Sequence, residues 1–390
     1  MYYINNVKPK TMKIKKILSL SAVVGLMFSF ASCKDPQAAD DEAMGSILNQ
    51  YVENTIAPTY SNLAAKSQEL VDALRTLQSN KTDANVQAVC NIFLEARSWW
   101  EKSEAFLFGP ANDFGIDPHI DSWPLDETGF NTMMNNTAQM QALAGDDGDV
   151  YAGDYLGNAL LGFHGIEYVL FENGAPKSAS AISDLYLTYA VAVAGDLRNR
   201  CFQLEVSWLG NKAPAAHVAR MEELEFNTTV NGGSFSYGEN MLKAGNAGST
   251  YATRASALAV IIDGCCSIAD EVGTSKIGKP YNGEDPTYIE SPYSQKSIED
   301  FYDNIISIQN SYMGGVEGRR DESKSLHHFV AEKDKDLDAE VMAAISEALR
   351  AIHNMKHPFV NNITDPSAGV ASDVCQKLDE TMAKVARVLK

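Results

Sequence analysis

The sequence predicts an all-α protein made of two helical bundles packed side by side. Apolar residues recur at the helical period of about 3.6 in every long hydrophobic segment, and no segment alternates as a strand would. One Gly-, Ser- and Asn-rich segment, residues 227–248, separates an earlier group of such segments from a later one. The chain has 390 residues and is 45% hydrophobic, which is enough to bury a large core.

The N-terminus has the pattern of an export signal. Five lysines and no acidic residue precede the apolar run at residues 17–32, which ends in Ala31-Ser32-Cys33. Cys33 stands where a bacterial lipoprotein signal places the cysteine that is acylated. We therefore expect residues 1–32 to be a lipoprotein signal peptide, residues 33–43 to be a tether, and the lipid on Cys33 to hold the protein to a membrane, by preference the outer membrane, on its periplasmic or surface side.

Charge and cysteine content exclude several classes of protein. The whole chain has a net charge of −19, and removal of the signal leaves 27 basic against 51 acidic residues, a net charge of −24. Such acidity argues against nucleic acid as a partner. Five cysteines remain after Cys33, with no C-x-x-C spacing, so neither a disulfide framework nor a zinc-thiolate site is indicated.

The helical segments follow one another along the exported part. Leu63, Leu70, Leu74 and Leu77 form one stripe on the first predicted helix. A similar stripe occupies the last helix. The predicted helices cover residues 60–78, 86–108, 155–171, 182–208, 253–272, 298–312, 337–355 and 374–389. The boundary at residues 227–248 then gives one bundle at residues 44–226 and a second at residues 249–390.

The most informative local pattern lies in the apolar segment 160–171, LLGFHGIEYVLF. His164 and Glu167 are three residues apart and therefore project from the same face of a helix. They can bind one metal ion, or they can form a hydrogen-bonded pair in the core. A carboxylate among so many apolar residues loses much of its hydration and needs a partner.

Zinc-peptidase motifs are incomplete in this chain. H-E-x-x-H is absent, and in the inverted form H-x-x-E-H the place of the second histidine is taken by Tyr168. No G-x-S-x-G nucleophile motif occurs either. The sequence therefore gives peptidase chemistry little support.

A second group of acids lies upstream of this motif. Glu101 and Glu104 are expected to share a helical face, and a loop with Asp117 and Asp121 follows them. These four carboxylates flank one turn. The aromatic residues around them indicate that some of the acids are at least partly covered; these are Trp99, Trp100, Phe106, Phe108 and Trp123.

Three stretches in this order resemble the imelysin-like family, in a lipoprotein of the kind found in Bacteroidetes. They are S-E-A-F-x-F-G-P at residues 103–110, I-D-P-x-I-D-x-W-P at residues 116–124 and G-x-H-x-x-E at residues 162–167. Residues 290–294 also resemble the family's E-S-x-x-S stretch. The resemblance covers roughly residues 44–390.

This resemblance implies two helical domains with a site at their interface and a role in bacterial iron uptake, in association with an iron transporter. It implies iron, as an ion or in an iron-containing ligand, as the bound group, although zinc, manganese or copper would accept the same donors. The metal ligands it implies are Glu101, Glu104, Asp121, His164 and Glu167. Further ligand contacts are expected at Trp123, Glu290 and Ser291.

Two other functions remain open. The family's peptidase label corresponds to a metallopeptidase that would use His164 and Glu167, with an open coordination position for an activated water. The protein could also be a surface interaction module in which the same pair is only structural.

Overall fold

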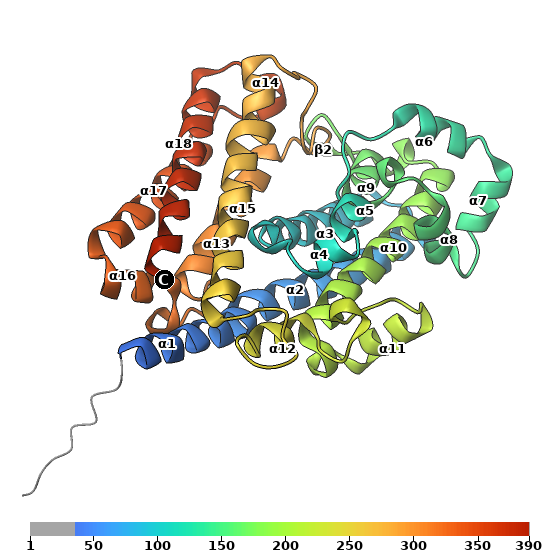
Figure 1. Ribbon diagram of the computed structural model, residues 1–390. Helices are drawn as coiled ribbons and strands as arrows, with labels where there is room; N and C mark the ends of the chain where they lie inside the picture. Colours follow the sequence, from blue (N-terminus) through green and yellow to red (C-terminus); the bar gives the residue numbers. More distant parts are fainter. Residues whose placement is uncertain (1–35, 390) are drawn as a thin grey trace, which may run out of the picture.

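The computed structural model describes residues 36–389 and confirms the all-α fold. The predicted signal peptide and Cys33 lie outside the described residues. Two sets of long helices stand beside each other (Figure 1). The first set consists of α2 (Ala57–Ser79), α3 (Asp83–Glu101) and α10 (Asp184–Leu209). The second set consists of α13 (Arg254–Asp270), α15 (Ser297–Met313), α17 (Lys335–His353) and α18 (Pro366–Ala383).

Shorter elements surround these two sets. The helices are α1 (Pro36–Gln50), α4 (Pro110–Asp113), α5 (Ile116–Ile120), α6 (Glu127–Met134), α7 (Thr137–Leu143), α8 (Gly148–Tyr155), α9 (Gly162–Leu170), α11 (Ala215–Glu223), α12 (Tyr237–Leu242), α14 (Gly278–Asn282) and α16 (Leu326–Lys333). Two π-helical turns are η1 (Tyr51–Ile56) and η7 (Glu271–Ile277), and η2 (Glu104–Phe106) is a 3-10 turn. A two-residue antiparallel pair, β1 (Phe171–Glu172) and β2 (Ala175–Pro176), follows α9.

Capping side chains mark where the long helices begin. Thr82 accepts a hydrogen bond from the backbone of Asn85 at the start of α3, and Thr253 and Ser256 form a reciprocal capping box at the start of α13. Asp365 caps α18, where Pro366 is the first helical residue. These polar side chains satisfy amide groups that have no partner inside the helix, so each break in the apolar pattern becomes a defined helix start.

One long helical path links the two sets. Helix α1 continues through η1 into α2. Helix α1 packs on α13, whereas α2 packs on α3 and α10. Residues 36–43 are thus helical where a tether was predicted. The predicted linker at residues 227–248 contains α12, which packs on α10 and on α1. Periodicity predicts that a helix exists, but it does not reveal which partner the helix covers.

The apolar cores of the two sets are continuous. Buried residues from α2, α3 and α10 belong to the same cluster as those of α13, α15, α17 and α18. Phe106 packs edge to face on Tyr60 and Tyr51, with ring centroids 5.6 and 6.3 Å apart. The five cysteines in residues 36–389 are unpaired. None of the helices in this part of the chain combines the length and the hydropathy that a membrane span requires.

Two predicted helices are shorter than expected. The one predicted over residues 86–108 ends at Glu101, and the one predicted over residues 155–171 is interrupted between α8 and α9. Helix α9 begins at Gly162, whose φ is +67°; a Cβ atom there would lie 1.8 Å from the backbone oxygen of Ile120. This close approach holds the start of α9 against the end of α5, and it requires glycine.

Substitution of Gly162 should therefore destabilise the protein. We expect Gly162→Ala to lower the free energy of unfolding by about 2–4 kcal/mol, because the methyl group would force α5 and α9 apart and the left-handed backbone disfavours alanine. Gly157→Ala is the matched control, since no atom lies within 4 Å of a Cβ atom at that position. Urea unfolding followed by circular dichroism measures both. Equal stabilities of the two variants would contradict this account of the α5–α9 contact.

Candidate metal centre between the two helical sets

A cluster of buried polar side chains, which we call the interface cluster, lies where α3 and α9 meet α15 and η7. We call residues 44–226 the first half of the chain and residues 249–389 the second half, so α3 and α9 belong to the first half and α15 and η7 to the second. The members of the interface cluster are Arg97, Glu101, Asp121, His164, Glu167, Lys276, Glu290, Ser291, Ser294, Asp300 and Asn304. The expectation that acids in this region are covered is confirmed, since Glu101 is 0% exposed and Glu104 is 7% exposed.

Arg97 lies at the centre of the interface cluster. Its Nη2 atom is 2.6 Å from Glu101 Oε1 and 2.6 Å from Glu290 Oε1, and its Nη1 atom donates a hydrogen bond to Asp121 Oδ1. Asp300 Oδ1 lies 4.0 Å from Nε. Burial alone would lower the pKa of Arg97, but the surrounding carboxylates outweigh it and raise the pKa above its usual value. The guanidinium is therefore a permanent cation inside the protein.

Lys276 is the second buried cation. Its Nζ lies 3.2 Å from Glu290 Oε1, 3.2 Å from Asn304 Oδ1 and 3.9 Å from Glu101 Oε2. The amide nitrogen of Asn304 donates to Glu101 Oε2 at 2.6 Å. Glu101 and Glu290 therefore each contact both cations, so this part of the cluster is held by shared ion pairs.

His164 lies between two carboxylates. Its Nε2 atom is 3.1 Å from Asp121 Oδ1, and its Nδ1 atom is 3.4 Å from Glu167 Oε2. The other oxygen of Asp121 accepts a hydrogen bond of 2.7 Å from Trp100 Nε1. Burial would lower the pKa of His164, but the contacts with Asp121 and Glu167 outweigh this and raise it to about 9. Arg97 and His164 hold the pKa of Asp121 well below its usual range, although burial opposes them.

The E-S-x-x-S stretch of the second half completes the cluster, and each of its polar residues has a different partner. Glu290 contacts Arg97, Ser291 Oγ donates to Asp300 Oδ2 at 2.5 Å, and Ser294 donates to Glu167 Oε1 from both its backbone nitrogen and its hydroxyl, at 2.7 and 2.6 Å. The H-x-x-E motif of the first half therefore meets the E-S-x-x-S motif of the second through Glu167 and Ser294.

Four of the five predicted metal ligands belong to the interface cluster, and the fifth lies at its edge. The cluster contains Glu101, Asp121, His164 and Glu167. Glu104 belongs to the turn η2 that follows the end of α3, so it does not share a helical face with Glu101. Its carboxylate lies within 4.8 Å of that of Asp121, and it lines a second cavity. The predicted contact residue Trp123 is partly exposed; its ring centroid lies 6.4 Å from that of His164 and 3.9 Å from that of Tyr288.

Sequence reasoning missed the positively charged centre of the cluster. Arg97 precedes Glu101 by four residues, a helical ion-pair spacing that would have been a usable signal. Lys276, Asp300 and Asn304 gave no such signal, because these partners lie 9 to 203 residues away along the chain.

Arg97 decides which atoms of the cluster are free for a metal ion. Carboxylate oxygens of Glu101, Asp121 and Glu290 lie within 4.8 Å of one another, but the guanidinium already contacts all three. His164 Nε2 is different: it makes no hydrogen bond of good geometry, and it lies 3.1 Å from Asp121 Oδ1, an oxygen that also accepts a hydrogen bond from Arg97 Nη1. An imidazole nitrogen and a carboxylate oxygen in such proximity fit two adjacent ligands of one ion.

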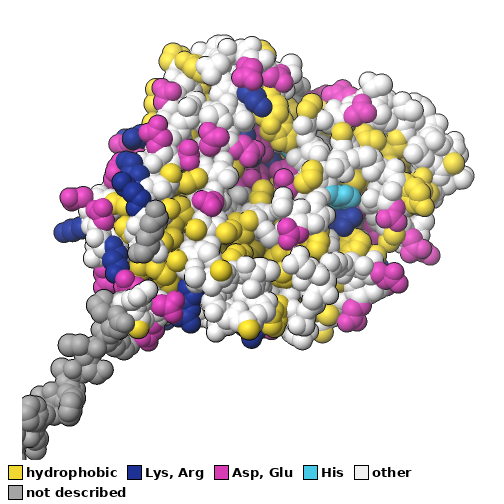
Figure 2. All heavy atoms as spheres, viewed as in Figure 1, with side chains coloured by type: hydrophobic (Ala, Val, Ile, Leu, Met, Phe, Trp, Pro, Cys, Tyr) yellow, Lys and Arg dark blue, Asp and Glu magenta, His cyan; other side chains and the backbone are white. Residues whose placement is uncertain are grey.

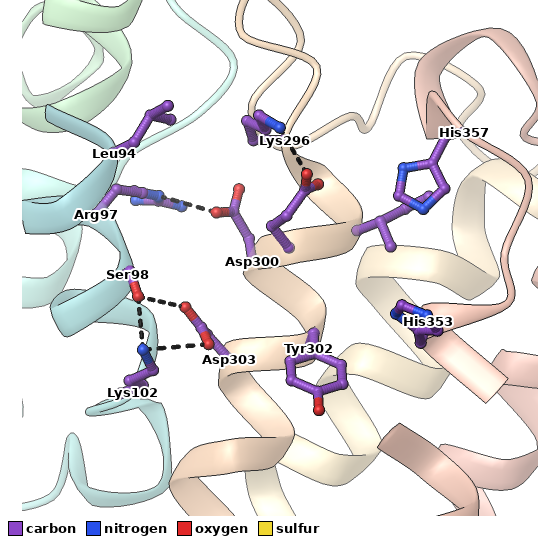
Figure 3. A pocket seen from close by; sticks show the side chains of 12 residues that line it. Leu94, Arg97, Ser98, Lys102, Lys296, Asp300, Tyr302, Asp303, His353 and His357 are labelled. Carbon is purple, nitrogen blue, oxygen red and sulfur yellow. Dashed lines mark hydrogen bonds and ion pairs between the residues drawn. The ribbon is translucent and has the colours of Figure 1, made fainter. Parts of the chain in front are cut away.

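A cavity of about 520 Å³ extends from Arg97 and Asp300 toward the surface. Figure 3 shows these two side chains pointing toward each other, with Lys102 and Asp303 on one side of the cavity and His353 and His357 across it. Burial raises the pKa of Asp300 to about 7, against the opposing effect of Arg97. The interface cluster is thus adjacent to a space that a small ligand can enter.

The raised pKa of His164 predicts how stability depends on pH. A protonated His164 stabilises the fold fully below its unfolded pKa of about 6.5, and this contribution is lost as the pH rises through about 9. We expect the stability lost in His164→Gln to be about 2–3 kcal/mol larger at pH 6 than at pH 10. Urea unfolding in the presence of a chelator measures it. His328→Gln, at an exposed histidine, should show no such trend, and a constant penalty for His164→Gln would refute the charged state.

Comparisons with known proteins identify the family. The family model described as Imelysin matches residues 56–385. Iron-regulated protein A of Synechococcus elongatus is 26% identical over 352 residues, which are 89% of this chain and 85% of that protein. A crystal structure from Parabacteroides distasonis ATCC 8503, described as an iron-regulated protein A precursor, superposes with a TM-score of 0.72 at 25% identity over 90% of this chain and 96% of its own. An imelysin-like protein from Psychrobacter arcticum 273-4 shares the fold, with a TM-score of 0.58 at 13% identity over 90% of this chain and 94% of its own. This chain belongs to the imelysin family.

Proposed function

We propose that this protein serves bacterial iron uptake by binding iron, as the ion or within an iron-containing ligand, at the interface cluster. Membership of the imelysin family and similarity to proteins named for iron regulation support an iron-related role. The observation that carries the proposal is the charge of the cluster. Five carboxylates are buried with only two permanent cations, so the site has more acids than cations to neutralise them.

The acids of the cluster outnumber its cations. Arg97 and Lys276 contact these carboxylates, and a protonated His164 would neutralise one more. Burial raises the pKa of Glu101 well above its usual value and that of Asp300 to about 7, against the effect of Arg97 on both, so protons take up part of the excess. A bound cation would replace these protons and relieve the repulsion among the acids, and the relief would be largest for an ion of charge two or three.

The position next to His164 Nε2 and Asp121 Oδ1 is the best one for iron in the cluster. Asp121 Oδ1 and His164 Nε2 face each other at 3.1 Å, and the other nitrogen of the ring is directed at Glu167, which Ser294 holds in place. A carboxylate that orients the far side of a metal-binding imidazole is a common arrangement in metal sites. Iron bound here would displace the proton of a protonated His164, so acid and iron would compete for the same site.

This competition gives the proposal its test. Anaerobic calorimetry with Fe²⁺ should detect binding at pH 7.5 that weakens at least tenfold at pH 5.5, because His164 must lose its proton. Asp121→Asn and His164→Ala should each weaken binding at pH 7.5 by about tenfold or more. The matched controls Asp154→Asn and His328→Ala change exposed residues outside the cluster and should bind as the unaltered protein does. Binding without pH dependence, or unchanged in both cluster variants, would contradict the proposal.

We also propose that the protein is exported and held to the outer membrane by lipid on Cys33, where it would pass iron to a transporter. The support is the signal pattern at residues 1–33. A membrane anchor would keep an iron-binding domain at the surface across which the ion must be moved.

Lipid labelling tests the anchor. Cells that express the full chain and are fed labelled palmitate should incorporate label into the protein, and Cys33→Ser should abolish both the label and the membrane association. Cys266→Ser is the control, because Cys266 is the most exposed cysteine of the described residues and should not affect labelling. Label that persists in Cys33→Ser would exclude the lipoprotein assignment.

A further inference from the structure

The cavity of about 520 Å³ beside Arg97 and Asp300 lies between α3 of the first half and α15 of the second. Figure 3 shows side chains of both helices around it, with His353 and His357 across from them. We call it the α3–α15 cavity. It shares Arg97 and Asp300 with the interface cluster, but none of the metal ligands that the family resemblance implies lines it. A volume of this size suits a small organic molecule.

Asp300 lies at the inner end of this cavity and has no cation of its own. It is 4% exposed, and its Oδ2 atom accepts a hydrogen bond of 2.5 Å from Ser291. The other oxygen, Oδ1, accepts no hydrogen bond from residues 36–389, and its ion pair with Arg97 Nε is long, at 4.0 Å. Arg97 also contacts three other carboxylates at closer range. Oδ1 is therefore the weakest of the partners of this guanidinium.

The pKa of Asp300 agrees with this geometry. Burial raises the pKa to about 7, and the nearby carboxylates of Glu290 and Glu167 add to the rise, whereas Arg97 and the hydroxyl of Ser291 lower it. The guanidinium thus offsets only part of the cost of burying this carboxylate. A positive group that approached Oδ1 from the cavity would stabilise the ionised form.

The other acids that line the cavity are already paired with lysines. Asp303 Oδ1 lies 3.5 Å from Lys102 Nζ, and Glu299 Oε1 lies 2.6 Å from Lys296 Nζ. Each pair also offsets the charge of its lysine, so neither lysine strongly repels a cation in the cavity. Asp300 is therefore the acid of the cavity at which a ligand can supply a missing positive charge.

Apolar side chains form much of the remaining wall. Leu94 comes from α3, and Ile298 and Tyr302 come from α15. The ring centroid of Tyr302 lies 6.5 Å from that of His353, the last residue of α17. A ligand that fits the cavity therefore has an apolar or aromatic body behind its polar group.

An ammonium group satisfies Asp300 better than other polar groups do. It brings a positive charge and three N–H donors, whereas a hydroxyl group brings no charge and a carboxylate would repel Asp300. The charge of the protein favours the same choice. The net charge is −19, and Asp and Glu side chains cover more of the face shown in Figure 2 than Lys and Arg side chains do. Such a surface attracts cations.

We propose that the α3–α15 cavity binds a small organic amine, whose ammonium group pairs with Asp300 Oδ1 and whose apolar body lies against Leu94, Ile298 and Tyr302. This function goes beyond iron binding and does not depend on it, because neither His164 nor Asp121 lines the cavity. Since α3 and α15 belong to different halves, a bound amine would also stabilise the contact between the halves.

Calorimetry at pH 8 tests the proposal on protein freed of metal by a chelator, with phenethylamine as the probe. We expect a dissociation constant of about 1 mM or tighter. Phenethyl alcohol has the same body without the charge and should bind about tenfold more weakly or worse. Hydrocinnamate, whose charge is reversed, should not bind detectably.

Two substitutions locate the site. Asp300→Asn keeps the shape of the side chain and removes its charge, so it should weaken amine binding about tenfold or more and leave binding of the alcohol unchanged. Leu94→Trp places a larger side chain in the cavity at a partly exposed position, and it should abolish binding of both probes. Glu95→Gln is the matched control, because Glu95 is an exposed acid beside Leu94 that does not line the cavity.

Thermal unfolding supplies a second readout. Phenethylamine should raise the melting temperature of the unaltered protein and of Glu95→Gln, but not that of Leu94→Trp. Equal affinities for the amine and the alcohol, tighter binding of hydrocinnamate, or the absence of amine binding would overturn the proposal. Amine binding that is unchanged in either cavity variant would overturn it too. Failure of Fe²⁺ to bind would leave it intact, since these measurements are made without metal.

Discussion

The contact between the two halves depends on the buried guanidinium of Arg97. It contacts Glu101 and Asp121 of the first half and Glu290 of the second. Without this guanidinium the three carboxylates would lose the cation that they share and would repel one another in a medium of low dielectric constant. The shared cation couples α3, the end of α5 and the E-S-x-x-S stretch, and so fixes the position of every polar group that surrounds them.

The same arginine shapes the chemistry of the site. It lies between three acids whose oxygens come within 4.8 Å of one another, and His164 Nε2, beside Asp121, is left without a hydrogen bond of good geometry. The proposed iron site is therefore at His164 and Asp121. A site of this kind does not resemble a zinc peptidase, in which two imidazoles and an open coordination position serve an activated water. The proposed iron site would suit reversible binding, because protonation of one imidazole would favour release of the ion.

The H-x-x-E motif of the first half and the E-S-x-x-S motif of the second contact each other directly. Glu167 of the H-x-x-E motif receives two hydrogen bonds from Ser294, and Asp300 receives one from Ser291. These contacts orient the imidazole of His164 from the side opposite Asp121. Residues of the second half therefore set the geometry of a site whose ligands come from the first, while the second cavity around Glu104 draws acids from both. The contact between the halves therefore carries the candidate site.

The sequence by itself determined the all-helical fold, the positions of most long helices and the motifs that contribute His164, Glu167 and Glu290 to the cluster. Hydrophobic periodicity and helix caps are local properties, and motifs such as G-x-H-x-x-E are contiguous in the chain. The sequence also placed Glu101 and Glu104 on one face, which the end of α3 prevents. Only the tertiary structure decided that α1 packs on the second half, that Arg97 and Lys276 neutralise part of the site, and that Glu104 lines a second cavity. These outcomes depend on which distant groups share a buried space. The local hydrophobic pattern shows that a residue is buried, but it does not show which distant residues pack against it.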